Sequence, residues 1–283
     1  MAKYLILGAR GQLGREFVKA LSDKKEDFVA LGKEECDVSN LRNVLEVFET
    51  VKPKIVINCA AYNQVDKAEE DYRDAIKVNS LGVRNLAFTC NKFKAFLIHY
   101  STDYVFDGNK ENGLYTEEDK ANPINEYGKS KLLGEYLLKE EIENYLIFRV
   151  SWVYGNGKQN FIYKLLQWVE NSEYLKIACD EVSVPTSTKT IVEVTFKALN
   201  QELTGLYHLT NSGYASRYEW AKEVFRIKGI KKLIKPVSAD IFNLPARRPR
   251  FSAMDNTVLS KVLNIEIPDW KFDLKEFLKG ARG

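Results

Sequence analysis

Histidine, cysteine and long apolar runs are scarce in this chain of 283 residues. Its two histidines, His99 and His208, are too few to favour a histidine-built zinc site, and no metal site is predicted. The four cysteines form no Cys-x-x-Cys pair, which is typical of reduced thiols in the cytoplasm. No apolar run is long enough to span a membrane, and no signal-peptide pattern begins the chain, so we expect a cytoplasmic protein without membrane contact.

A strong excess of either charge is also lacking. The 42 Lys and Arg residues nearly balance the 39 Asp and Glu residues, for a net charge of +3. Nucleic-acid binding calls for a concentrated basic face, so no nucleic-acid partner is expected. The 45% hydrophobic content is enough to bury a sizeable core, in one large α/β unit or two modest domains.

The first half of the chain alternates apolar segments with amphipathic ones. Helical periodicity is clear over residues 41–51, which Ser39 or Asn40 would cap, and over 75–93. Such alternation predicts a Rossmann-type, doubly wound parallel sheet within residues 1–150. A helix near 188–204 should return to this sheet, and residues 151–283 should otherwise form a smaller substrate-binding lobe with a helix over 218–226. The predicted strands are 3–7, 28–31, 54–59, 95–100 and 145–150.

A glycine loop follows the first predicted strand. Gly8, Gly11 and Gly14 are spaced Gly-x-x-Gly-x-x-Gly, and a helix-like run begins at Arg15. Glycines between a strand and a helix let the backbone approach a pyrophosphate, which the free N–H groups and positive dipole of the helix then face. The loop therefore predicts a dinucleotide site, although it could also serve only to tighten strand–helix packing.

Acid–base chemistry is indicated after the fourth predicted strand. Tyr127 and Lys131 are four residues apart and share a helix face. An ammonium near a phenol favours the phenolate, so Lys131 is expected to lower the pKa of Tyr127. Tyr154 with Lys158 and Tyr218 with Lys222 have the same spacing, but only the Tyr127 pair lies in the predicted cofactor-binding half.

Thr102 and Asp103 end that fourth strand. The hydroxyl of Thr102 is suited to hydrogen-bond a carbonyl oxygen in front of Tyr127 and to stabilise charge developing there. A simple strand-capping turn is the alternative. His99, just inside the strand, is interpreted as structural.

The choice of cofactor depends on the end of the second strand. An acid here would hold the ribose hydroxyls of NAD, but Gly32 and Lys33 follow instead, and Arg10 lies in the glycine loop. Two cations favour a 2′-phosphate, whereas the nearby Glu34 and Glu35 oppose it. We therefore predict NADPH, with NADH usable.

These motifs together resemble the extended short-chain dehydrogenase/reductase superfamily, and more closely its dTDP-4-dehydrorhamnose reductase branch, over nearly the whole chain. The glycine loop and Tyr-x-x-x-Lys occur throughout the superfamily. Two blocks are more particular to the branch: Ser151-Trp152-Val153-Tyr154 and Pro245-Ala246-Arg247-Arg248-Pro249.

The resemblance implies NADPH-dependent reduction of the 4-keto group of dTDP-4-dehydro-β-L-rhamnose to dTDP-L-rhamnose, in dTDP-rhamnose biosynthesis. Tyr127 would then be the proton donor, assisted by Lys131 and Thr102. Substrate contacts would come from Thr102, Asp103, Tyr127 and Trp152. Cofactor contacts, with the motif positions included, would come from Gly8, Arg10, Gly11, Gln12, Leu13, Gly14, Asp37, Val38, Ala60, Ala61, Tyr62, Tyr127 and Lys131.

Two other functions remain open. One is reduction of a different nucleotide-linked 4-keto-6-deoxy sugar. The other is a non-catalytic, NADP-binding regulatory subunit of the methionine adenosyltransferase type, which the complete Thr102, Tyr127 and Lys131 set argues against. The family pattern also leaves a homodimer open. Glu16 and Glu193 lie near positions that bind magnesium in some relatives, but they are interpreted as surface ion-pairing residues.

Overall fold

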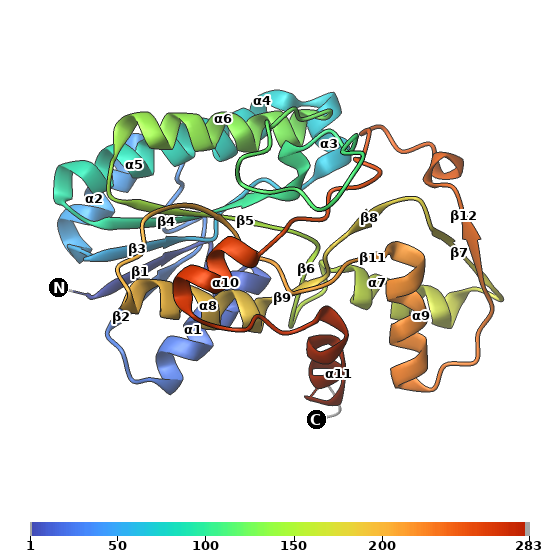
Figure 1. Ribbon diagram of the computed structural model, residues 1–283. Helices are drawn as coiled ribbons and strands as arrows, with labels where there is room; N and C mark the ends of the chain where they lie inside the picture. Colours follow the sequence, from blue (N-terminus) through green and yellow to red (C-terminus); the bar gives the residue numbers. More distant parts are fainter. Residues whose placement is uncertain (1, 281–283) are drawn as a thin grey trace.

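The structure is a computed structural model that describes residues 2–280. Its larger lobe is built on a six-stranded parallel sheet in the order β10-β5-β4-β3-β1-β2 (Figure 1). This order confirms the predicted doubly wound fold. From β1 the chain leads to β2 on one side and β3 on the other, so a ligand-binding crevice is expected at their carboxyl ends. The strands are β1 (Tyr4–Leu7), β2 (Phe28–Leu31), β3 (Ile55–Asn58), β4 (Phe96–Thr102), β5 (Tyr145–Val150) and β10 (Gly205–His208).

Helices cover both faces of the sheet (Figure 1). Side chains alternate along a strand, so Ile6 packs on one face while Leu5 and Leu7 pack on the other. One face is covered by α1 (Gln12–Asp23), α8 (Thr188–Asn200) and α10 (Thr257–Leu263). The other is covered by α2 (Leu41–Val51), α5 (Gly82–Phe93) and α6 (Glu126–Glu141), beside the short α3 (Val65–Glu70) and α4 (Tyr72–Ile76).

The predicted elements agree closely with the observed ones. The helix predicted over 41–51 is α2, and Asn40 rather than Ser39 caps it by accepting a hydrogen bond from the Asn43 amide. The returning helix is α8. The segment predicted as one helix over 75–93 is helical from Tyr72 to Phe93, but it contains a π-helical turn at Lys77–Leu81 that periodicity did not reveal.

The smaller lobe has its own apolar core around Trp220, Tyr154 and Leu165. It is not simply the second half of the chain, because α8, β10 and α10 return to the large sheet (Figure 1). Its three two-stranded ladders are β6 (Val153–Tyr154) with β9 (Thr186–Ser187), β8 (Val182–Ser183) with β11 (Ala215–Ser216), and β7 (Leu175–Ala178) with β12 (Ile234–Val237). Its helices are α7 (Phe161–Asn171), α9 (Arg217–Lys228) and α11 (Trp270–Gly280). Among residues 2–280, no helix is long and apolar enough to cross a bilayer.

Helix α6 lies unusually close to the π-helical turn. A Cβ added at Gly134 would be 2.1 Å from the Asn79 carbonyl oxygen, and one at Gly128 would be 2.2 Å from the Tyr104 carbonyl oxygen. Both neighbours are backbone atoms, so neither can rotate away. The absence of side chains at these two glycines fixes the height of α6 above the sheet.

Gly134→Ala is therefore expected to lower the free energy of unfolding by about 2 kcal/mol, the scale of an overpacked core position. Urea unfolding measures the change. Gly280→Ala is the control, because its methyl group would meet no atom within 4 Å, and it should be close to neutral. A Gly134→Ala protein as stable as the wild type would contradict the close packing of α6.

Candidate active site

The glycine loop requires glycine for steric reasons. Gly8 has a φ of +70°, and a Cβ there would be 2.6 Å from the Ala60 nitrogen. A Cβ at Gly14 would be 2.4 Å from the Gly8 carbonyl oxygen. Helix α1 then begins at Gln12 without a side-chain cap, so its first N–H groups are left for another partner. An uncapped helix N-terminus suits an anionic phosphate group.

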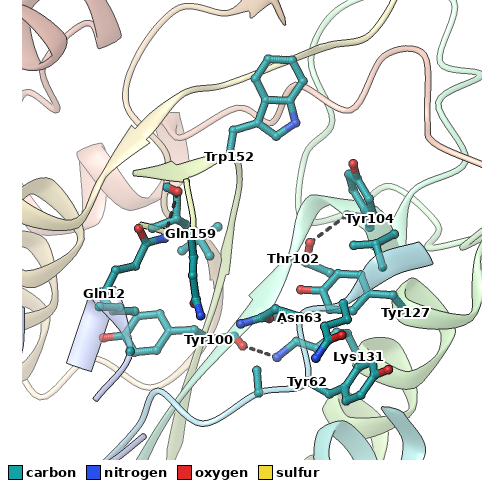
Figure 2. A pocket seen from close by; sticks show the side chains of 18 of the residues that line it. Gln12, Tyr62, Asn63, Tyr100, Thr102, Tyr104, Tyr127, Lys131, Trp152 and Gln159 are labelled. Carbon is teal, nitrogen blue, oxygen red and sulfur yellow. Dashed lines mark hydrogen bonds between the residues drawn. The ribbon is translucent and has the colours of Figure 1, made fainter. Parts of the chain in front are cut away.

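A cavity of about 880 Å³ opens beside this loop (Figure 2). Eleven of the predicted site residues line it: Gly11, Gln12, Leu13, Ala60, Ala61, Tyr62, Thr102, Asp103, Tyr127, Lys131 and Trp152. Gly8, Arg10, Gly14, Asp37 and Val38 are not part of its lining. The elements that meet here are far apart in the sequence, and they meet where parallel sheets usually bind ligands.

The helix that carries Tyr127 and Lys131 is α6, which begins at Glu126. Asn125 caps α6 by accepting a hydrogen bond of 2.7 Å from the Gly128 amide. Lys131 is buried and donates a hydrogen bond of 2.6 Å from its Nζ to the Tyr100 carbonyl oxygen (Figure 2). Burial lowers the pKa of Lys131 to about 8, while the negative charge of Glu135 acts in the opposite direction.

The expected lowering of the Tyr127 pKa by Lys131 is not found: the net shift is upward, and Lys131 is not among the groups that cause it. Although Tyr127 is only partly buried, withdrawal of its hydroxyl from bulk water raises its pKa above the usual value. The hydroxyl of Thr102 lowers this pKa but does not outweigh burial, and Asp103 and Tyr104 raise it further. The phenol therefore stays protonated at neutral pH, as a proton donor requires.

Thr102 ends β4 and Asp103 begins a short 3₁₀ turn, as their position at the strand end suggested. The Thr102 hydroxyl accepts from the Tyr104 amide and donates to Asp103 Oδ1, both at 3.2 Å. Asp103 Oδ2 accepts from the hydroxyls of Ser183 and Ser252 at 2.8 and 2.6 Å. Burial raises the pKa of Asp103, against the effect of these hydroxyls. Its carboxyl group thus joins β4 to two segments of the smaller lobe.

Trp152 stands where the two lobes meet. Its φ of +39° is a left-handed conformation that a bulky side chain rarely adopts. The ring stacks on Trp220 at 5.7 Å between centroids, and the Arg217 guanidinium lies 3.5 Å from its centroid. Such strain is often found at functional sites. Trp152 also lines a second cavity of about 850 Å³, which continues from the first into the smaller lobe.

The two acids next to Arg10 are engaged with it. Its guanidinium contacts Glu34 at 2.7 Å and Glu35 at 2.5 Å, and Glu35 also accepts a hydrogen bond from the Gly32 amide. The cations predicted to favour a 2′-phosphate are thus partly neutralised. Asp37 accepts from the backbone and side chain of Ser39, and Val38 is buried beneath Gly82.

Sequence reasoning missed the residue that joins the loop after β3 to α6. Asn79 Oδ1 accepts from the Tyr62 amide, while its Nδ2 donates to the Tyr62 carbonyl and to Ser130 Oγ, at 2.8 to 3.0 Å. Ser130 in turn donates to the Tyr127 carbonyl. Asn79 lies in the π-helical turn, a feature often found at functional sites. The only sign of this role in the sequence was an asparagine in the middle of the helix predicted over 75–93.

Other missed residues add charge to the cavity. Lys67, Lys158, Lys164 and Arg248 line it with Lys131, against the acids Asp66 and Asp103. Arg248 is paired with Asp66 at 2.8 Å. Glu16 and Glu193 are not part of the cavity lining. Glu16 accepts a hydrogen bond of 3.3 Å from Thr188 Oγ1, and Glu193 is 3.9 Å from the Lys189 ammonium.

The sheet, the glycine loop and the Thr102, Tyr127 and Lys131 set define an oxidoreductase of the extended short-chain dehydrogenase/reductase class. A family model described as the RmlD substrate binding domain matches residues 2–282. A dTDP-4-dehydrorhamnose reductase of Burkholderia thailandensis is 34% identical, covering 95% of this chain and 96% of the relative. The chain therefore belongs to this family, the dTDP-4-dehydrorhamnose reductases.

Further relatives agree with this assignment. The spore coat polysaccharide biosynthesis protein SpsK of Bacillus subtilis is 34% identical, over 99% of this chain and 98% of that protein. The crystal structure of a Clostridium acetobutylicum dTDP-4-dehydrorhamnose reductase superposes with a TM-score of 0.95 at 37% identity, covering 99% of both chains. A Bacillus anthracis dTDP-4-dehydrorhamnose reductase, solved in complex with NADP, superposes with a TM-score of 0.94 at 33% identity, covering 99% of this chain and all of the other.

Replacing Asn79 with Leu is expected to lower the free energy of unfolding by about 2 to 3 kcal/mol, because both backbone groups of Tyr62 lose their partner. Ser130→Ala is the matched control. It removes the hydroxyl that Asn79 contacts but leaves both Tyr62 bonds in place, so its cost should be about 1 kcal/mol. Denaturant unfolding of the two proteins checks this order, and equal losses would contradict it.

Proposed function

We propose that this chain reduces the 4-keto group of dTDP-4-dehydro-β-L-rhamnose to dTDP-L-rhamnose with NADPH. One observation carries the proposal: Thr102, Tyr127 and Lys131 line the same cavity as the uncapped N-terminus of α1. The near full-length similarity to proteins named dTDP-4-dehydrorhamnose reductase supports the substrate, and a 33% identical relative solved with NADP supports the cofactor.

The cofactor and the side chains in the cavity have separate parts in the reaction. NADPH, when bound, supplies the hydride for C4 of the sugar. Tyr127 donates the proton that the carbonyl oxygen needs as it becomes an alcohol, and its raised pKa keeps that proton available. The ammonium of Lys131 offsets the negative charge left on the Tyr127 oxygen. The Thr102 hydroxyl has one proton, which it donates to Asp103 Oδ1 in this structure, and we infer that it turns this proton to the substrate oxygen when the sugar binds.

The charge and shape of the two cavities suit two anionic ligands. Five cationic and two acidic side chains line the first cavity, which favours the phosphates of both a dinucleotide and a sugar nucleotide. The second cavity contains the aromatic rings of Phe161, Trp168 and Trp220. We infer that the thymine base of the substrate binds in this part, against the rings of the smaller lobe.

The smaller lobe, the cellular location and the oligomeric state complete the proposal. The smaller lobe, with Trp152 at its junction with the sheet, binds the substrate. The four cysteines of the protein are free, which supports a reducing compartment, and we propose that the protein is cytoplasmic. The homodimer stays a prediction.

Tyr127→Phe is expected to lower kcat by about 100- to 10,000-fold, the usual contribution of a positioned general acid. NADPH consumption with dTDP-4-dehydro-β-L-rhamnose measures it. Tyr218→Phe is the control, because Tyr218 has the same spacing to a lysine but lies in α9, outside the cavity lining. A Tyr127→Phe protein that keeps the wild-type rate would contradict the assigned mechanism, and NMR of the product would show whether a different sugar is reduced.

The double variant Glu34→Gln, Glu35→Gln is expected to raise the preference for NADPH over NADH by about tenfold. It frees the Arg10 guanidinium to pair with the 2′-phosphate and removes two repelling charges. Arg10→Gln should change the preference in the opposite direction. The ratio of kcat/KM values for the two cofactors measures both effects. Identical ratios in all three proteins would exclude this role for Arg10.

A further inference from the structure

A row of buried polar side chains lies behind Lys131, and the chemistry proposed above does not use it. Asn58 at the end of β3, His99 in β4 and Lys131 in α6 are each at most 2% exposed. They are in contact in that order, and the row begins at the Ala60 amide on the edge of the cavity. Buried polar groups are costly unless their partners are well placed, so the direction of each bond matters.

The Ala60 amide fixes the orientation of Asn58. This N–H donates to Asn58 Oδ1 at 3.0 Å, which identifies the oxygen and leaves Nδ2 directed at His99. Asn58 Nδ2 lies 3.1 Å from His99 Nδ1. An amide NH₂ group only donates, so Nδ1 must accept and carries no proton. A neutral His99 therefore has its proton on Nε2.

The Nε2–H group of His99 faces Lys131. The distance from Nε2 to Lys131 Nζ is 3.5 Å, and Nζ also donates to the Tyr100 carbonyl oxygen at 2.6 Å. An ammonium has no acceptor site, so the protonated lysine places donor against donor at this contact. The neutral amine instead has a lone pair that accepts from Nε2–H.

Other charges near Lys131 are largely balanced. Glu135, one turn further along α6, favours the ammonium, but it is tied to Arg149 by two bonds of 2.8 and 3.0 Å and to Ser101. Burial and the Lys131 charge hold the pKa of His99 well below its usual value, so the imidazole stays neutral. The other titratable groups that line the cavity with Lys131 on this side are Cys59 after β3, Tyr100 in β4, Asp103 and Tyr104 after β4, and Tyr127 in α6, and Glu135 with its partner Arg149 lies behind.

We propose that His99, held by Asn58 in its Nε2–H tautomer, is a positioning residue that opposes the ammonium form of Lys131 and thereby sets the alkaline limit of the reaction. The proposal rests on the proposed function only in that Lys131 takes part in the reduction. Because Asn58 is fixed by the Ala60 amide, the backbone that lines the cofactor side of the cavity also fixes the tautomer.

NMR of protein labelled with ¹⁵N-histidine tests the tautomer without any turnover. The chain has two histidines, and His208 Nδ1 contacts the Tyr115 carbonyl oxygen at 3.1 Å, which requires a proton on Nδ1. The two rings should thus show opposite tautomers, and His99→Asn assigns the signals. A proton on Nδ1 of His99 would overturn the proposal, whereas it would leave the proposed activity untouched.

The same spectra report on Lys131. Between about pH 6 and about pH 10 the His99 signals should stay those of a neutral ring, and they should move with one inflection near pH 8 as Lys131 loses its proton. In Lys131→Met the tautomer should persist and the inflection should vanish. An inflection that survives in Lys131→Met, or no inflection in the wild type, would contradict the coupling.

His99→Asn separates positioning from a purely structural role. Its Oδ1 takes the place of Nδ1 and keeps an acceptor for Asn58, while the donor opposite Lys131 is lost. The pH above which kcat declines, which is the alkaline limb of its pH profile, should rise by about one unit, with KM little changed. Asn58→Asp should invert the tautomer in the NMR spectrum and move the limb in the same direction. Loss of stability with an unmoved limb would mean that His99 is only structural.

Discussion

Helix α6 touches the backbone of its neighbours at two points, and the geometry of the site depends on this contact. Gly128 meets the Tyr104 carbonyl and Gly134 meets the Asn79 carbonyl, at distances that leave no room for a methyl group. Tyr127 lies next to the first contact, and Lys131 lies between the two. Their side chains are therefore held at the carboxyl end of β4 by packing of main chain on main chain, which tolerates less movement than packing of flexible side chains.

The same close packing explains the electrostatics of the site. A lysine and a tyrosine held this near the sheet lose much of their hydration, so burial is the largest influence on the pKa of each. Burial disfavours the charged form of both groups, which raises the pKa of the phenol and lowers that of the ammonium. A proton donor for carbonyl reduction needs the first effect. The second effect lowers the pKa of Lys131 to about 8, so that its protonation state can change near neutral pH.

Local sequence patterns were sufficient for the fold and for the principal site residues. The alternating segments predicted the sheet, the glycine spacing predicted the loop, and the four-residue spacing placed Tyr127 and Lys131 on one helix face. What could not be predicted depends on contacts between distant segments. The direction in which the pKa of Tyr127 shifts depends on how its hydroxyl is buried, which the sequence does not show. The role of Asn79 depends on the contact between the π-helical turn and α6. Spacing along one helix contains neither kind of information.

Asp103 shows how such long-range contacts join the two lobes. The family resemblance implied a substrate contact for Asp103, yet its carboxyl group is satisfied by Ser183 and Ser252, which come from the smaller lobe. The next atom in this network is the Thr102 hydroxyl, beside Tyr127. Because breaking any one bond of a buried network leaves a polar group unsatisfied, the position of the smaller lobe and the orientation of Thr102 constrain each other. The lobe that offers the aromatic cavity thus also helps to orient the hydroxyl next to the proton donor.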